Sequence, residues 1–264
     1  MTMLAQRRFW TTCSLLLAVF LTSATLSRAA TIPNVAAASD LQFALPEIAS
    51  RFAQATGREV KLAFGSSGNF RRQINEGAPF ELFLSADEAY VDALAKEGRT
   101  EGEGVRYAIG RIVLFAPHGS TLRPDPEFKD LAAAVADGRI KRFAVANPEH
   151  APYGRAAREA LQRAGVWDVI VPRLVLGENV SQAAQFASSG GGQGGIFAYS
   201  LALSPAVAKL GTFVLIPAHS HNPLNQRMVL VKGAGETARE FYRYLQQPAA
   251  REIFRRFGFA LPDE

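Results

Sequence analysis

The chain has 264 residues, of which 48% are hydrophobic and 20% charged, a composition that excludes a mainly disordered protein and suits one or two globular domains. Its formal net charge is +5, but Arg7, Arg8 and Arg28 belong to an N-terminal segment that we expect to be removed, which leaves +2. So small a positive excess gives no reason to expect nucleic-acid binding.

The first 29 residues have the pattern of a cleavable signal peptide. Two arginines precede an apolar stretch, Trp10–Leu21, that is too short for a comfortable membrane span, and Ser27 and Ala29 supply the small residues of a cleavage site. We therefore expect a periplasmic protein that does not span a membrane once this segment is removed. The single cysteine, Cys13, lies inside it, so the mature protein should contain no disulfide, thiolate nucleophile or cysteine-based metal site.

The rest of the chain alternates short apolar runs with segments of helical periodicity. The first part predicts strands at 32–39, 59–64, 80–87 and 107–117, and helices at 45–57, 70–76 and 88–98. The second part predicts helices at 127–136, 154–164, 180–188 and 199–208, and strands at 140–146, 173–177, 194–198 and 212–217. A late strand at 226–233 and helices at 235–245 and 248–257 close the chain.

Strands that alternate with helices predict an α/β fold with mostly parallel sheets flanked by helices. The roughly 235 residues of the mature chain suit two lobes better than one core. We expect lobe 1 to comprise residues 30–111 plus 227–264 and lobe 2 to comprise residues 112–226. The long strands at 107–117 and 226–233 are the candidates for crossings between the lobes.

Four strand-to-helix junctions, at 38–41, 65–68, 153–154 and 178–181, carry small and polar residues. Ligands of open α/β sheets bind at the C-terminal ends of strands, so two junctions from each lobe would meet in one cleft. Helix N-termini and free N–H groups favour an anion there, with hydroxyl groups from Ser39, Ser67 and Tyr153 and without a lysine. The same residues also fit ordinary helix caps and turns, which leaves both interpretations open.

Four segments also carry a family resemblance: VAAASDLQFALPEIASRFAQATG, FGSSGNFRRQINEGAPFELFLSAD, NPEHAPYGRAAREAL and LVLGENVSQAAQFASSG. In this order they resemble the molybdate-binding periplasmic proteins of ABC transporters, over about Val35 to Gly258. The resemblance implies a two-lobed, type II-like binding-protein fold with a hinge of two crossing strands. It further implies molybdate or tungstate as ligand, no cofactor, no metal-coordinating or catalytic side chain, and a membrane permease as partner.

Position by position, the resemblance puts ligand contacts on Ser39, Ser67, Tyr153 and Val180. The two serines would give hydroxyl and backbone donors, and Val180 its backbone N–H. Tyr153 would give its N–H, with its phenol left open. The secondary candidates are Asp40, Ser66 and Tyr199. Some family members have a tyrosine at the position that Ala198 occupies here, and Tyr199 is the next residue.

Asp40 allows two orientations. Turned inward, its carboxylate would repel a dianion and suit a protonated anion such as hydrogen phosphate, whose O–H needs an acceptor. Turned outward, it is a helix N-cap, and this is the orientation we expect. Asp87 should cap the next helix or contact the other lobe, and His150 should lie in a surface loop, with a proton-sensitive gate as the alternative.

We therefore expect an exported solute-binding protein and not an enzyme. The alternatives are the same fold binding sulfate, thiosulfate or phosphate, a carrier that feeds a sensor, and an exported phosphotransferase or hydrolase using Ser67. The run Gly190–Gly195 fits GxGxxG but lies after a helix and before a strand, so it predicts a flexible turn and no dinucleotide site. His219 and His221 could share a strand face, but without a third ligand they predict no metal site.

Overall fold

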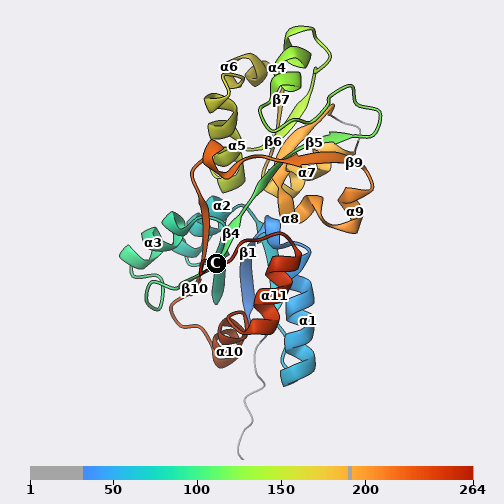
Figure 1. Cartoon of the computed structure of the whole chain (residues 1–264). Coiled ribbons are helices and arrows are strands. Elements are labelled where there is room, and N and C mark those ends of the chain that lie inside the picture. The colour runs from blue at the N-terminus through green and yellow to red at the C-terminus, as the bar shows by residue number, and fades with distance from the viewer. Residues whose placement is uncertain (1–31, 190–191, 264) are drawn as a thin grey trace, which may run out of the picture. The chain divides into compact units, whose positions relative to one another are not determined.

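The structure is a computed structural model that describes residues 32–189 and 192–263. The predicted signal peptide, residues 1–29, and residues 190 and 191 of the predicted glycine-rich turn lie outside this range. The described chain forms two lobes, each built on a five-stranded sheet (Figure 1). None of the helices in the described ranges is long and apolar enough to cross a membrane.

The first lobe contains a mixed sheet. Its strands, in sheet order, are β2 (Lys61–Gly65), β1 (Asn34–Ala38), β3 (Leu82–Ser85), β10 (Leu224–Leu230) and β4 (Val105–Gly110). The strand β1 pairs in parallel with β2 and β3, whereas β10 pairs antiparallel with β3 and β4. Four strands therefore point one way and β10 runs against them.

The second lobe repeats this arrangement. Its strands, in sheet order, are β7 (Leu174–Gly177), β6 (Phe143–Ala146), β8 (Gly195–Ala198), β5 (Ile112–Pro117) and β9 (Gly211–Leu215). Here β5 is the reversed strand, antiparallel to β8 and β9. The expected α/β class with mostly parallel sheets is confirmed for both lobes.

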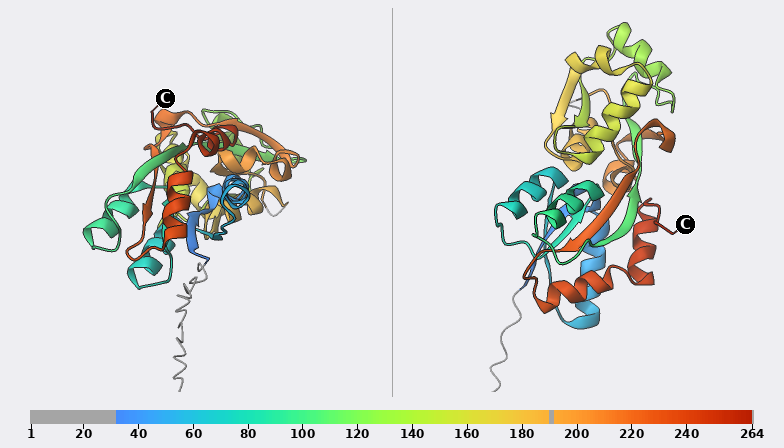
Figure 2. Two further views of the ribbon diagram at one scale, coloured as in Figure 1. Left: turned by 90° about the horizontal axis from the view of Figure 1, so that it is seen from below. Right: turned by 90° about the vertical axis from the view of Figure 1, so that its left-hand side faces the viewer.

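Helices flank both sheets (Figures 1 and 2). Those of the first lobe are α1 (Ala44–Thr56), α2 (Ser67–Asn75), α3 (Glu88–Lys96), α10 (Glu236–Tyr244) and α11 (Pro248–Arg256), with a 3₁₀ turn, η1 (Ser39–Leu41). Those of the second lobe are α4 (Lys129–Ala136), α5 (Pro152–Arg163), α6 (Trp167–Ile170), α7 (Val180–Ser188), α8 (Tyr199–Ala202) and α9 (Pro205–Ala208), with 3₁₀ turns η2 (Val171–Arg173) and η3 (Ala218–Ser220).

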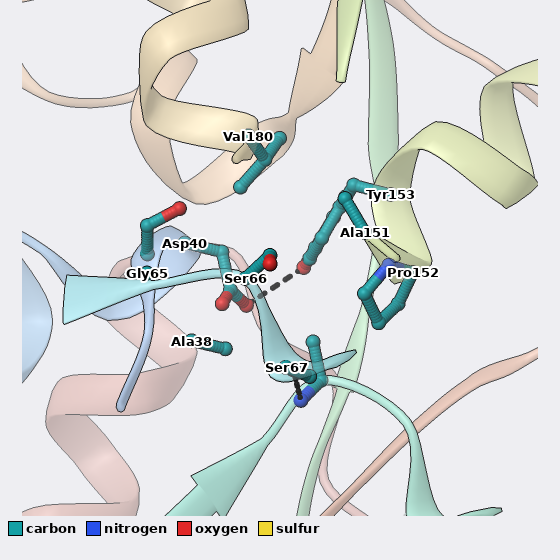
Figure 3. A pocket seen from close by; sticks show the side chains of 11 residues that line it. Ala38, Asp40, Gly65, Ser66, Ser67, Ala151, Pro152, Tyr153 and Val180 are labelled. Atoms are coloured by element: carbon teal, nitrogen blue, oxygen red, sulfur yellow. Dashed lines mark hydrogen bonds between the residues drawn. The ribbon is translucent and has the colours of Figure 1, made fainter. Parts of the chain in front are cut away.

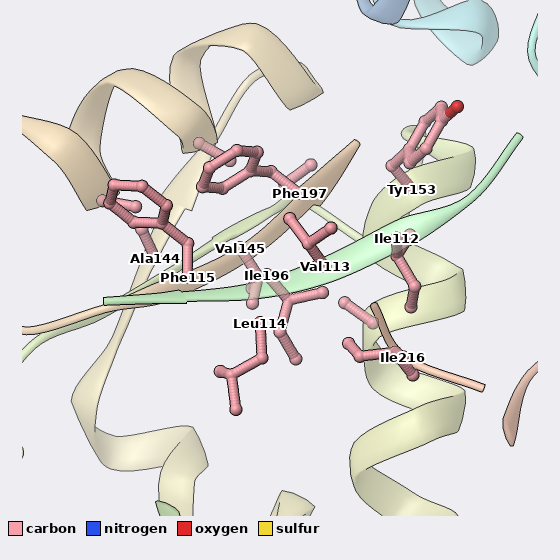
Figure 4. Packing of buried hydrophobic residues seen from close by; sticks show 14 of the residues in the cluster. Ile112, Val113, Leu114, Phe115, Ala144, Val145, Tyr153, Ile196, Phe197 and Ile216 are labelled. Carbon is pink, nitrogen blue, oxygen red and sulfur yellow. The ribbon is translucent and has the colours of Figure 1, made fainter. Parts of the chain in front are cut away.

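The cores follow from the alternation of side chains along buried strands. In β1, Val35 and Ala37 face the core shared with α1, α10 and α11, whereas Ala36 faces the core shared with α2 and α3. In the second lobe, strands β5, β6 and β8 contribute a continuous apolar core that reaches Tyr153 at the start of α5 (Figure 4). Burial of both sheet faces holds the strand ends, and hence the junctions that follow them, in fixed positions.

Three local expectations are wrong. The strand expected at 107–117 is two strands in different sheets, which meet at Arg111, so this segment does cross between the lobes. The second crossing comes from residues 216–223, because β10 lies entirely in the first sheet. The helix expected at 199–208 is split, since Ser204 caps a new helix and Pro205 cannot donate to the preceding turn.

Candidate oxyanion-binding site

A small cavity lies where the four polar junctions meet (Figure 3). Its volume is about 10 Å³ for the centre of a water-sized sphere, which is the room that one water molecule needs. The residues that line it are Ala38, Ser39, Asp40, Gly65, Ser66, Ser67, Ala86, Ala151, Pro152, Tyr153 and Val180. Both lobes contribute to this wall, and none of the lining side chains is basic.

Helix N-termini supply the positive character of the cavity. The first N–H groups of an α-helix have no acceptor inside the helix, and this applies to Ser67 in α2, Tyr153 in α5 and Val180 in α7. In α7 the Asn179 side chain accepts from the N–H groups of Ser181 and Gln182 and leaves that of Val180 uncapped. The wall therefore presents main-chain donors of the kind that hold anions at helix N-termini.

Two serine hydroxyls add to these donors. Ser67 is fully buried, and its Oγ accepts from the N–H of Ala86 at 2.9 Å, so its own O–H proton stays available. Ser39 Oγ donates to Asn179 Oδ1 at 3.1 Å and accepts from the N–H of Ser181 at 3.2 Å. The Ser39 hydroxyl therefore links the two lobes. To donate to a ligand, it would have to give up its hydrogen bond to Asn179 Oδ1.

Asp40 does not have the orientation that we expected from the sequence. Its side chain is 1% exposed, and the 3₁₀ turn that it belongs to has no side-chain cap. Oδ2 accepts from the Tyr153 hydroxyl at 2.8 Å and from Gln226 Nε2 at 2.6 Å, which draws the carboxyl inward. The outward N-cap is thus wrong, because two buried donors hold the carboxyl inside the protein.

Burial raises the pKa of Asp40 from 3.8 to about 6. The hydrogen bonds from Gln226 and Tyr153, together with the nearby N–H groups of residues 40 and 41, lower the pKa and offset part of this effect. Burial, helped by the Asp40 charge, raises the pKa of Tyr153 well above its usual value. The phenol of Tyr153 is therefore a neutral donor to Asp40, and the main-chain N–H is the donor that Tyr153 presents to the cavity.

The secondary candidates Ser66 and Tyr199 differ in position. Ser66 lines the cavity, caps α2 by accepting from the N–H of Asn69, and lies 3.0 Å from His150 Nδ1. Tyr199 does not line the cavity; its ring packs against Phe213 at a centroid distance of 6.0 Å. Tyr199 is thus separated from the other candidates, whose role as ligand contacts stays a prediction.

Further contacts join the lobes around the cavity. The N–H of Gly68 donates to the carbonyl oxygen of His150 at 3.0 Å, and Arg155 pairs with Asp87. Asp87 also caps α3 by accepting from the N–H of Ala89, so both roles expected for it are confirmed. His150 lies in the loop between β6 and α5, as expected, and this loop also makes the contact with the first lobe.

Two polar residues of the site were missed by sequence reasoning. Gln226 is a fully buried glutamine in strand β10, and Asn179 caps α7. A glutamine within a β-strand pattern and an Asn-x-x-Gln start of a helix are the available signals. His219 and His221 lie in and just after the turn η3, so the expectation that they share a strand face is wrong. No cluster of three metal-binding side chains occurs within the ranges described.

A ligand cavity between two α/β lobes that are joined by two crossings defines a solute-binding protein. Residues 33–260 match the family model described as bacterial extracellular solute-binding protein, and the chain belongs to this family.

Its relatives include molybdate-binding proteins. The chain is 37% identical over 216 residues to the molybdate-binding protein ModA of Rhodobacter capsulatus, covering 81% of this chain and 82% of that protein. It is 34% identical over 233 residues to ModA of Escherichia coli (strain K12), covering 86% and 88%. The solved periplasmic molybdate-binding protein of Azotobacter vinelandii superimposes with a TM-score of 0.79 at 30% identity, covering 87% and 99%.

Proposed function

We propose that this protein captures molybdate or tungstate in the cavity between its lobes and delivers it to the permease of an ABC transporter. The observation that carries the proposal is a cation-free cavity lined by helix N-termini and serine hydroxyls, in a chain whose relatives are named for molybdate binding. We further propose a periplasmic location after signal-peptide cleavage, and lobes close to the expected residues 30–111 plus 227–264 and 112–226, with the second boundary moved to residue 224, where β10 of the first sheet begins.

The size and charge of the cavity support a small oxyanion. Room for a single water-sized sphere leaves no space for a sugar or a peptide, and one tetrahedral ion enters only if the walls move outward. Desolvating a dianion is costly, so close and preorganised N–H and O–H donors must replace its water shell. We propose Ser39, Ser67, Tyr153 and Val180 as these donors, with Asp40 and Ser66 beside them.

Calorimetric titration of the mature protein with molybdate, tungstate, sulfate, thiosulfate and phosphate tests the proposal. Tight binding of molybdate and tungstate with weak binding of sulfate is the expected result. All these ions bind through oxygen acceptors, so the discrimination has to come from cavity size. Preference for sulfate, thiosulfate or phosphate would reassign the ligand while keeping the carrier function. Absence of binding to every oxyanion would refute the proposal.

The contact between Ser66 and His150 gives a reason to test for hydrolysis as well. A serine beside a histidine is the minimal pair of a nucleophile and its base. Here, however, Ser66 serves as a helix cap, and Glu178, at 3.5 Å from His150 Nε2, has a 70% exposed side chain. We propose that the pair closes the lobes and does no catalysis. Turnover of a phosphoester or ester that is lost in Ser66→Ala or Ser67→Ala would contradict this.

A further inference from the structure

The two carboxyl oxygens of Asp40 have different surroundings. Oδ2 accepts two hydrogen bonds, from Tyr153 and Gln226. Oδ1 is buried and makes no hydrogen bond with any described residue, although Asp40 lines the cavity. Figure 3 shows the carboxyl turned toward the Tyr153 hydroxyl, in the space that Ser66, Ser67 and Val180 surround. A buried polar atom without a partner requires an explanation, and here it lies in the wall of a ligand cavity.

The network behind Asp40 decides which oxygen can carry a proton. The Tyr107 hydroxyl donates to Gln226 Oε1 at 2.6 Å, which orients the amide so that its Nε2 faces Asp40. Gln226 Nε2 also lies 3.1 Å from the Tyr153 hydroxyl, so both donors to Oδ2 are held in place. A proton on Oδ2 would displace one of them. A proton on Oδ1 displaces nothing and turns that oxygen into a donor.

We propose that Asp40 binds a proton on Oδ1 together with the oxyanion, so that each dianion enters the cavity with one proton and accepts a hydrogen bond from the neutral carboxyl. This inference rests on the proposed function, because it assumes a dianion in this cavity. An ionised Asp40 would place a negative acceptor against the acceptor oxygens of the ligand in a buried space. Protonation removes that repulsion and makes Asp40, the acidic residue of the cavity lining, a hydrogen-bond donor to the ligand.

The groups that face Asp40 from the surrounding elements do not compete for this proton. Burial raises the pKa values of Tyr153 on α5 and Tyr107 on β4 well above their usual value, so both phenols stay neutral. Gln226 on β10 does not titrate. Neither does Ser200 on α8, whose hydroxyl donates to the main-chain oxygen of Asp40 at 2.8 Å.

One histidine next to the cavity wall needs a control of its own. His150 contacts Ser66, a lining residue, and lies 3.5 Å from Glu178. The charge of a histidine also depends on pH. Any pH effect on binding therefore has to be assigned to Asp40 or to His150 by substitution.

The size of the expected effect follows from linkage. Burial raises the pKa of Asp40 to about 6, so the ligand-free carboxyl is half protonated at that pH. At pH 8 only about 1% of it is protonated, and the ligand must bring the proton with it. The Kd for molybdate should therefore rise about 50-fold between pH 6 and pH 8, with uptake of about one proton per ion at pH 8.

Isothermal titration with molybdate at pH 6, 7 and 8, in pairs of buffers that differ in ionisation enthalpy, measures both quantities. The variants are Asp40→Asn and, as a matched control, His150→Gln. In Asp40→Asn the amide oxygen can accept from Tyr153 and Gln226 while its NH₂ group takes the place of Oδ1 as a permanent donor. Asp40→Asn should bind at pH 8 about as tightly as the wild type does at pH 6, without proton uptake. His150→Gln should retain the pH dependence of the wild type.

Three results would overturn the inference while leaving the carrier function intact. The wild type could bind molybdate with the same Kd and no proton uptake from pH 6 to pH 8. Asp40→Asn could retain the pH dependence and His150→Gln lose it. Phosphate could bind more tightly than molybdate in the wild type and lose affinity in Asp40→Asn, which would make Asp40 an ionised acceptor for a ligand O–H. Failure of the wild type to bind any oxyanion would instead refute the proposed function, and this inference with it.

Discussion

The substitution Ser67→Ala tests two roles of one hydroxyl, as a donor to the ligand and as an acceptor that stabilises the fold. The Ser67 hydroxyl is fully buried at the cavity, accepts from the N–H of Ala86 and has its own proton free. A hydrogen bond to a charged group contributes about 1.5–3 kcal/mol, so its loss should weaken molybdate binding about 10- to 150-fold. The substitution also leaves the buried N–H of Ala86 unsatisfied, which should lower the free energy of unfolding of the ligand-free protein by about 1–3 kcal/mol.

Calorimetric titration and urea unfolding of the same preparations distinguish the two effects. Ser204→Ala is the matched control, because Ser204 is also fully buried and caps α9 but does not line the cavity. It should lose about 1 kcal/mol of stability, as expected for a helix cap, with the affinity for molybdate unchanged. If Ser67→Ala lost stability but kept its Kd within twofold of the wild type, the hydroxyl would not be a ligand donor.

Three further predictions concern lobe closure, the main-chain donors and the buried carboxyl. In Gly68→Ala the new Cβ would lie 2.6 Å from the carbonyl oxygen of His150 in the other lobe, so titration should show affinity lower by on the order of tenfold with an unchanged ligand-free Tm. Gly154→Ala, whose Cβ would lie 2.2 Å from a carbonyl of its own lobe, should lower Tm. Val180→Pro removes one N–H at a helix position that accepts proline, and should weaken binding about tenfold with an unchanged circular dichroism spectrum; an unchanged Kd would exclude this N–H as a donor. Because the folded state raises the pKa of Asp40 from 3.8 to about 6, it holds more protons than the unfolded chain within that window. As the pH rises through this window, the free energy of unfolding of the wild type should therefore fall by up to about 3 kcal/mol relative to that of Asp40→Asn. Urea unfolding without ligand measures it at each pH. A difference in unfolding free energy between the two proteins that stays constant with pH would contradict the raised pKa.

Local patterns were sufficient for most of the fold. Helix α1 ends at Gly57, which adopts a φ of 69° as a left-handed cap, and α7 begins directly after Asn179 as its pattern predicts. The errors occur where tertiary structure overrides periodicity. A continuous apolar run at 107–117 cannot reveal that its two halves belong to different sheets, because both halves are buried strands with the same composition.

The candidate site was predictable where it depends on strand ends and helix starts, which are local features. It was not predictable where it depends on partners distant in sequence. The orientation of Asp40 is set by Tyr153, 113 residues away, and by Gln226, 186 residues away. A helix-cap preference of about 1 kcal/mol cannot compete with two such hydrogen bonds to a buried carboxyl. An acidic residue next to a strand end is therefore ambiguous until the topology is known.

The contact between Ser39 and Asn179 shows how ligand binding and lobe closure can be compatible. A hydroxyl has one proton, and Ser39 donates it to Asn179 Oδ1. That oxygen also accepts from the N–H and the Oγ of Ser181 and from the N–H of Gln182. Ser39 can therefore turn its proton to an oxyanion without leaving the cap of α7 unsatisfied, while its Oγ still accepts from the N–H of Ser181 in the other lobe. Binding of the ion then removes one of the four donors to Asn179 Oδ1 and keeps the hydrogen bond from Ser181 to Ser39 between the lobes. The lobes can therefore stay closed while the Ser39 hydroxyl donates to the ion.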